Sequence, residues 1–169
     1  EKEIGTIEQI NVTPIKKYQV IIGKLFPFWS IALFELAFGM TIGKLIFKVP
    51  IIGSIPLIFF VAAIYLLVIL SLGLFISTMV HTQQQSMFLT YFFMMIFILM
   101  SGLFTSIENM PGWAQAINVA NPIAYFIRII RMVMLKGSGF EDIKDDFFSI
   151  VALVVLTTTL AIWRYKKTV

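Results

Sequence analysis

Four long apolar blocks, separated by shorter polar segments, dominate the pattern of this sequence. They cover about residues 25–47, 56–80, 87–104 and 147–163. An α-helix needs about 20 apolar residues to cross the hydrocarbon core of a bilayer, which is about 30 Å thick. The pattern therefore predicts an all-α polytopic membrane protein with four transmembrane helices.

A polar strip of 24 residues precedes the first apolar block. Ile4, Ile7 and Ile10 recur in it at near-helical spacing between charged residues, which is typical of a short amphipathic helix on a membrane surface. Pro14 interrupts this helix, because the residue before a proline is driven toward extended geometry. We therefore divide the chain into a cytosolic amphipathic segment, 1–24, and a transmembrane domain, 25–169.

The first apolar block contains a proline, a carboxylate and a pair of glycines. Pro27 falls in the first turn of the expected span, where its missing N–H costs little. Glu35 lies near the middle, where a carboxylate costs about 2.5–3.5 kcal/mol, so we expect it to face a bundle interior or an aqueous path. It is either a protonated or hydrogen-bonded packing residue or a contact for a proton or substrate. Gly39 and Gly43 form a small-xxx-small pattern that favours close helix packing within the chain.

Residues 105–146 break the apolar pattern and are predicted to form an external loop. Trp113 is interpreted as an aromatic residue at the membrane interface. The stretch 114–119 is too short to span a bilayer, and Asn121-Pro122 ends whatever helix precedes it. A re-entrant or interfacial helical segment is therefore expected here.

The segment after this break has an amphipathic pattern. Its apolar residues share one helical face, with two arginines away from that face; these are Tyr125, Ile129, Met132 and Val133 against Arg128 and Arg131. Two interpretations stay open, a helix resting in the headgroups or the return arm of a re-entrant hairpin. The acidic run that follows is interpreted as the solvated surface of a loop; it comprises Glu141, Asp142, Asp145 and Asp146.

Composition and the distribution of charge narrow the function classes. Only 13% of the residues are charged and 59% are hydrophobic, whereas soluble domains carry about 25% charged residues. The sequence has no cysteine and one histidine, which excludes disulfides and thiolate metal sites within it. The net charge of +4 comes from basic residues at the ends of the apolar blocks. It therefore indicates membrane topology, with both termini in the cytoplasm, and no nucleic-acid partner.

Several short motifs, taken in their order along the chain, resemble one membrane protein family. The opening Glu1-Lys2-Glu3-Ile4-Gly5-Thr6-Ile7-Glu8, with Thr13-Pro14 and Gly23-Lys24 after it, resembles the cytosolic segment of bacterial type-2 ABC exporter permeases. Three later stretches resemble the external re-entrant region of that family. They are Ser101-Gly102-Leu103-Phe104, Asn109-Met110-Pro111-Gly112-Trp113, and Asn121-Pro122 followed by Arg131. Together the matches cover almost the whole chain.

The resemblance implies that this chain is part of an ABC transporter transmembrane subunit. The sequence has neither an initiator methionine nor a signal-peptide pattern, and we expect it to be a fragment that corresponds to the last four of six spans in the bacterial inner membrane. The opening segment would be a coupling helix, seated in a groove of a cytosolic ABC ATPase, through Glu1, Glu3, Gly5, Thr6 and Glu8. The external re-entrant region would contain Gly102, Pro111, Trp113, Asn121, Pro122 and Arg131.

The resemblance also implies where the chemistry of transport takes place. ATP and Mg would be bound by the partner ATPase, and no cofactor or metal by this chain. A second permease subunit, identical or different, would complete the exporter within the lipid bilayer, with the substrate path between the two permeases. The chain would therefore be a transporter subunit and not an enzyme.

Two other function classes are weighed against this interpretation. A passive channel or a membrane assembly subunit would share the four spans but would not need the opening strip. An intramembrane hydrolase would use Glu35 or His81, yet the sequence contains no H-E-x-x-H, no paired aspartates within its spans and no G-x-S-x-G. The transported substrate is not identified by the Phe- and Met-rich spans, because membrane helices use the same residues for packing.

Overall fold

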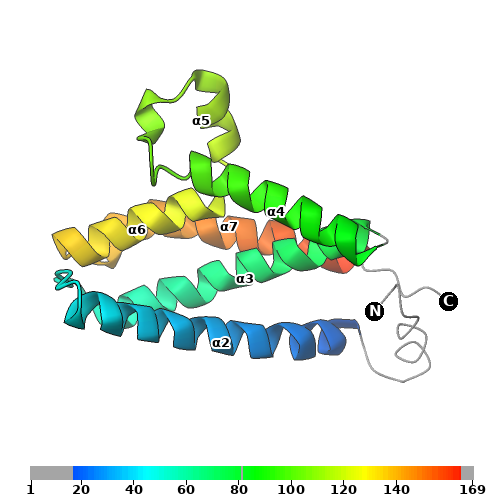
Figure 1. Ribbon diagram of the computed structural model, residues 1–169, viewed down its shortest axis with the longest axis horizontal. Helices are drawn as coiled ribbons and strands as arrows, with labels where there is room; N and C mark the ends of the chain where they lie inside the picture. The colour runs from blue at the N-terminus through cyan, green and yellow to red at the C-terminus, as the bar shows by residue number, and fades with distance from the viewer. Residues whose placement is uncertain (1–16, 81, 165–169) are drawn as a thin grey trace.

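A computed structural model describes residues 17–80 and 82–164 of the protein, and the regular structure in this part is helical (Figure 1). In chain order the elements are α2 (Lys17–Leu45), α3 (Ile55–Met79), α4 (Gln83–Met100), the short 3-10 helix η1 (Ile107–Asn109), α5 (Gly112–Asn118), α6 (Pro122–Lys136) and α7 (Phe140–Arg164). Among the described residues, α2, α3, α4 and α7 are long and apolar enough to cross a membrane. This confirms the predicted all-α fold with four spans. The expected coupling helix at 1–16 lies outside the described residues.

Three of the spanning helices begin several residues earlier than the apolar blocks indicate, and one of them is α4, which begins at Gln83. α2 begins at Lys17, so Pro27 lies in the helix interior and the prediction that it occupies the first turn is wrong. α7 begins at Phe140 and includes the acidic run, which the sequence analysis assigned to a loop. The Asp142 carboxylate accepts a hydrogen bond from the Gly139 N–H at 3.0 Å, and carboxylates near a helix N-terminus are favoured by the helix dipole. This capping explains why the helix starts ahead of its apolar part.

The buried core lies where α3, α6 and α7 pack together. It consists of Ile58, Val61, Val68, Ile129, Val133, Ile143, Phe147 and Ile150. α3 and α7 run in the same direction, and α6 lies along them in the opposite direction (Figure 1). The hydroxyls of Ser71 and Thr158 form a hydrogen bond of 3.0 Å between α3 and α7. These three helices therefore form the compact part of the bundle.

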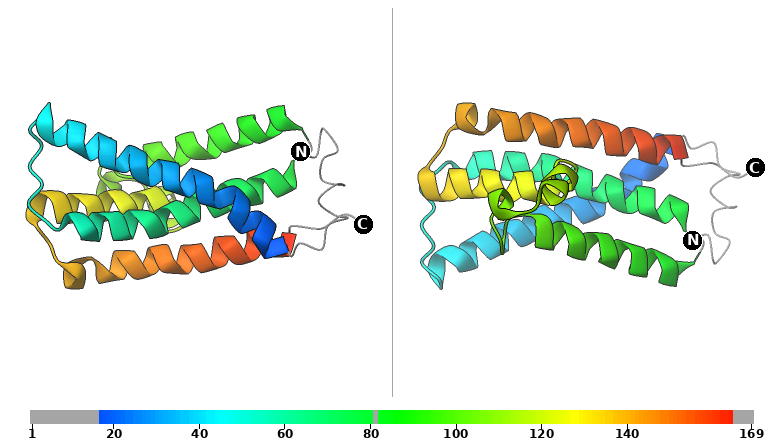
Figure 2. Two further views of the ribbon diagram at one scale, coloured as in Figure 1. Left: turned by 90° about the horizontal axis from the view of Figure 1, so that it is seen from below. Right: turned by 90° about the horizontal axis from the view of Figure 1, so that it is seen from above.

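α2 lies outside this core and crosses α3 obliquely (Figure 2, left). The side of α2 that faces the core carries Trp29 and Met40. Glu35 is exposed, because at about 100° per residue it lies on a different side of the helix. Glu35 therefore does not face the interior of this chain's bundle, and its exposure to an aqueous path stays a prediction. An alanine Cβ at Gly39 or Gly43 would meet no neighbouring atom within 4 Å, so the predicted close packing within the chain is wrong, whereas packing of these glycines against a second subunit stays a prediction.

The two ends of the bundle are distinct. The Lys17 end of α2 and the Arg164 end of α7 lie together (Figure 1), and we call this the terminal end. The α2–α3 connector and the α6–α7 turn lie together at the opposite, connector end, where the Ile52 N–H donates to the Met134 carbonyl at 3.0 Å.

Candidate functional site at the broken helix pair

A broken helix pair, α5 and α6, lies between the third and fourth spans. The two helices meet at an angle of 84° and together fit a broken span or a re-entrant loop. α5 stands away from the bundle, whereas α6 lies along it (Figures 1 and 2). Ile129 and Val133 of α6 are fully buried, so the side of α6 that carries them faces the core. This arrangement favours the return arm of a re-entrant hairpin over a helix resting flat in the headgroups.

Asn121 holds the bend between the two helices. Its side chain is 1% exposed. The Nδ2 group donates to the Phe97 carbonyl at 2.8 Å and to the Asn118 Oδ1 at 2.9 Å, and the Oδ1 accepts from the Ile123 N–H at 3.0 Å. Asn121 therefore caps α6 and ties it to the last turn of α4. Pro122 fits directly after it, because the first helical position needs no N–H.

The chain enters the broken pair through Gly102, which has a φ of 83°. This left-handed conformation favours glycine, and an alanine Cβ here would also meet the Ile107 side chain at 3.1 Å. Pro111 immediately precedes α5. Trp113 follows in the first turn of α5 and is exposed, as an aromatic residue at an interface is. Of the predicted residues of this region, Gly102 thus lies in a turn and Asn121 caps α6. Pro111 precedes α5, and Trp113 faces outward.

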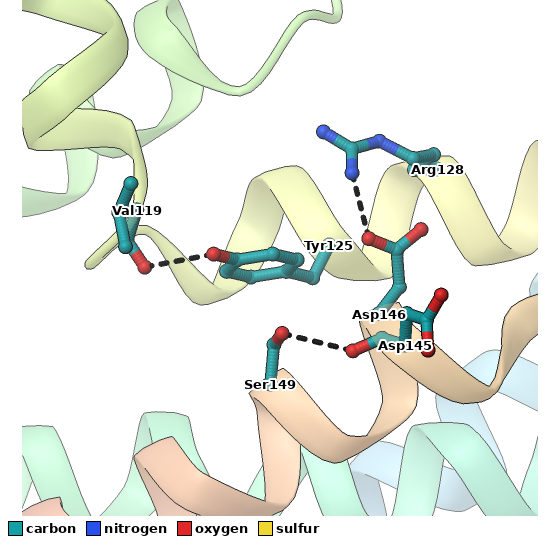
Figure 3. Close-up of polar contacts among 6 residues, drawn as sticks. All are labelled: Val119, Tyr125, Arg128, Asp145, Asp146 and Ser149. Atoms are coloured by element: carbon teal, nitrogen blue, oxygen red, sulfur yellow. Dashed lines mark hydrogen bonds and ion pairs between the residues drawn. The ribbon is translucent and has the colours of Figure 1, made fainter.

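An ion pair joins α6 to α7 (Figure 3). The Arg128 Nη1 lies 2.6 Å from the Asp146 Oδ1, and the side chains are 48% and 13% exposed. The Arg128 guanidinium also lies 5.8 Å from the centre of the Tyr125 ring, within the range of a cation–π contact. The Tyr125 hydroxyl donates to the Val119 carbonyl at 3.0 Å. Together these contacts link both sides of the bend to the last span.

The sequence pattern predicts this region but not the ion pair. It indicates Arg128 on the polar side of a helix and Asp146 on a solvated loop. Oppositely charged residues 18 positions apart carry no pairing signal until the direction of both helices is known. Arg131, which the sequence analysis did name, reaches the Leu103 carbonyl at 3.5 Å.

The structure places the predicted site residues in separate parts of the molecule. Gly102, Asn121, Pro122 and Arg131 lie around the junction of α4 with the broken pair. Glu35 lies on the exposed side of α2, and the predicted coupling residues at positions 1–8 lie outside the described residues. Across residues 17–80 and 82–164, no three His, Asp or Glu side chains are placed to hold a metal ion. The junction thus provides a fixed helix break within an apolar bundle.

Removing the Arg128 side chain is expected to destabilise the junction of α6 and α7. Arg128→Ala leaves the largely shielded Asp146 carboxylate without its counter-charge, at a cost of about 1 kcal/mol. We expect a lower midpoint of thermal unfolding for the purified protein in mild detergent. The exchanged pair, Arg128→Asp with Asp146→Arg, should recover part of the loss.

A second ion pair on α7 supplies the control. Lys144 and Glu141 lie 3.5 Å apart and are both largely exposed, so Lys144→Ala is expected to leave the midpoint unchanged. Equal effects of Arg128→Ala and Lys144→Ala would show that the α6–α7 ion pair contributes nothing specific.

Comparison with known proteins assigns this chain to a group of membrane transporters. Residues 1–135 match the family described as ABC-2 type transporter. The chain is 32% identical over 169 residues to the probable multidrug ABC transporter permease YbhR of Escherichia coli K12, which covers 100% of this chain and 46% of that protein. It is 30% identical over 173 residues to the inner membrane transport permease YhhJ of the same strain, again covering 100% and 46%.

A third relative matches a shorter stretch. The daunorubicin resistance ABC transporter permease protein DrrB1 of Streptomyces coeruleorubidus is 33% identical over 70 residues, which cover 41% of this chain and 25% of that protein. No solved structure matches the chain. The chain spans about half the length of YbhR and YhhJ, at 46% of each.

Proposed function

The chain belongs to the ABC-2 type transporter family, and we propose that it is the C-terminal four-span portion of a permease subunit that exports a substrate when a partner ATPase hydrolyses ATP. The observation that carries the proposal is the alignment of the entire chain with YbhR and with YhhJ. Four candidate spans and one broken helix pair in the described residues fit a polytopic permease.

In this proposal the chain transmits energy and the partner supplies it. ATP and Mg are bound by the cytosolic ABC ATPase, and this chain binds no cofactor. The segment 1–8, with its acidic and apolar positions, seats in a groove of the ATPase as an amphipathic helix and moves when the ATPase closes. Both termini are then in the cytoplasm, and the broken pair is on the external side of the inner membrane.

A second permease subunit, identical or different, completes the exporter. Large apolar side chains are exposed along α2 and α4, which leaves surface for lipid and for another subunit. The substrate path then runs between the two permeases. The names of YbhR and DrrB1 refer to multidrug transport and to daunorubicin resistance, and they support an amphiphilic drug-like substrate, for which ethidium is a practical probe.

Reversing charge in the opening segment is the test of this function. In the full-length permease, Glu3→Lys with Glu8→Lys is expected to abolish ATP-dependent ethidium export and to weaken co-purification with the ATPase, because the docking surface changes sign. The amount of permease in the membrane should stay the same. Export is measured in cells and association in mild detergent.

Glu108→Lys is the matched control, because Glu108 lies in η1, on the side of the membrane that the proposal places outside. It should leave export and association intact. Survival of both activities in the Glu3→Lys, Glu8→Lys variant would overturn the coupling role. Ethidium flux that proceeds without ATP would instead indicate a passive channel.

A further inference from the structure

Hydrogen bonds at two heights hold α2 and the connector that follows it to the rest of the described bundle. At the connector end, the Ile52 N–H donates to the Met134 carbonyl at 3.0 Å, and Gly53 packs directly on Val133. Midway along α2, the Trp29 Nε1–H donates to the Ala63 carbonyl of α3 at 2.9 Å. The Leu45 end of α2 continues into this anchored connector, whereas the Trp29 bond holds the helix itself on α3. The helix can therefore turn about Trp29 but cannot slide freely along α3.

The Trp29 contact fixes the position of α2 on α3 in a way that apolar packing does not. The Ala63 carbonyl lies within α3, where carbonyls accept from the N–H four residues on, so the indole is an additional donor. An indole N–H surrounded by apolar groups keeps such a partner, because leaving it unpaired is costly. The bond therefore specifies both the height and the rotation of α2. Phe26 stacks beside Trp29, with 6.2 Å between ring centres.

A break in the hydrogen bonding of α2 lies close to this contact, at Pro27. Pro27 has no N–H to donate to the Gly23 carbonyl, so one hydrogen bond of the helix is missing there. The Ser30 hydroxyl donates back to the Phe26 carbonyl at 3.0 Å, an interaction that also bends helices. Figure 2 (left) shows α2 turning toward its Lys17 end. We call residues 17–26 the inner arm and residues 30–45 the outer arm.

We propose that Trp29 is the pivot through which movement of the inner arm is transmitted to the outer arm and to α3. This inference rests on the proposed function, because it is the ATPase-bound segment preceding α2 that displaces the inner arm. With the Trp29–Ala63 bond in place, α2 is held at Trp29 when the inner arm is displaced. The outer arm therefore rotates about Trp29. Without the bond, the inner arm hinges at Pro27 and the outer arm stays behind. Trp29 is thus a positioning residue for energy transmission.

The test uses the full-length permease with its ATPase in lipid vesicles. This chain contains no cysteine, and spin labels can be attached at pairs of exposed positions introduced as cysteines. The pair Ile22→Cys with Ile162→Cys reports on the inner arm at the terminal end. The pair Leu45→Cys with Phe148→Cys reports on the outer arm at the connector end. Distances are measured without nucleotide and with ATP plus vanadate.

In the wild-type background we expect ATP plus vanadate to shift both distances together. Trp29→Phe keeps an aromatic ring and removes only the N–H. It should leave the inner-arm shift intact and lower the equilibrium constant between shifted and unshifted outer-arm pairs by about threefold, the effect of one interhelical hydrogen bond in a membrane. Trp163→Phe, at an exposed position of α7, is the matched control and should change neither distance.

The outcomes separate this inference from the proposed function. If the inner arm does not move with ATP plus vanadate in the wild type, ATP coupling itself fails. If the inner arm moves and the outer arm follows equally in wild type and Trp29→Phe, the function stands and the pivot is overturned. A general loss of stability would broaden both distance distributions even without nucleotide. The pivot instead predicts that only the response of the outer-arm distance to ATP plus vanadate changes.

Discussion

Replacing Gly53 with alanine is expected to disrupt the connector end of the bundle and to lower the free energy of unfolding by about 3 kcal/mol. An alanine Cβ would clash with the Val133 carbonyl oxygen and would lie 2.8 Å from the Val133 Cγ1. The first of these atoms belongs to the backbone and cannot rotate away, as the end of a flexible side chain can. Relief therefore requires the connector to separate from α6.

That separation would also remove one hydrogen-bond donor from the last turn of α6, while the Gly137 cap stays in place. The Val133 carbonyl accepts from the Gly137 N–H at 3.1 Å, and the Met134 carbonyl accepts from the Ile52 N–H at 3.0 Å. These carbonyls are among the last of the helix, which have no partner within it. Moving the connector leaves the Met134 carbonyl without the Ile52 donor, whereas the Val133 carbonyl keeps the Gly137 N–H, so the lost Ile52 bond adds to the cost of the clash.

The measurement is the midpoint of thermal unfolding of the purified permease in mild detergent, together with its yield from the membrane. Gly73→Ala is the control, because an added Cβ at Gly73 in α3 meets no neighbouring atom within 4 Å and alanine is the better helix former. Its midpoint should be unchanged or slightly higher. If Gly53→Ala were as stable as Gly73→Ala, the close contact between connector and α6 would be wrong.

Asn121→Ala is expected to lower the free energy of unfolding by about 2–4 kcal/mol, because it leaves two backbone groups without partners. The Ile123 N–H loses its acceptor and the Phe97 carbonyl loses a donor. Both groups lie at a junction where Asn121 itself is 1% exposed, so water does not readily replace the lost bonds. The bend between α5 and α6 should loosen from the end of α4.

The same substitution at Asn109 tests whether the effect is specific to the junction. Asn109 is exposed at the end of η1, and Asn109→Ala should change the unfolding midpoint little. Protease accessibility of the α4–α5 segment provides a second readout, which we expect to rise in Asn121→Ala only. Similar midpoints for the two variants would remove Asn121 as the residue that holds the bend.

The sequence predicted the membrane spans well but the helix starts poorly. Apolar length alone identifies a span, because the bilayer requires it. No such requirement governs the polar residues beside a span. The acidic start of α7 is helical because Asp142 caps the chain at Gly139, and α2 continues through Pro27 back to Lys17. Both depend on local hydrogen bonding and packing that hydropathy does not report.

The candidate site was predicted as a region and not as a set of contacts. Gly102 and Asn121-Pro122 stood out because glycine and proline mark turns whatever surrounds them. The partners of Asn121 and Arg128 could not be predicted, because they lie on helices whose mutual placement the sequence pattern leaves open. The predicted role of Glu1–Glu8 falls outside the described residues and stays a prediction.

The sequence by itself determined that this is a helical membrane protein with four spans, and it determined where the broken pair interrupts them. The spans follow from the length of each apolar block. The position of the broken pair follows from glycine and proline residues, which mark turns whatever surrounds them. Only the tertiary structure decided which face of α2 meets α3, that Glu35 and Gly39 lie off that face, and that Arg128 pairs with Asp146. An apolar helix in lipid can turn any side toward its neighbours, so its rotation is decided by the particular contacts that fit, such as the bond from Trp29 to Ala63.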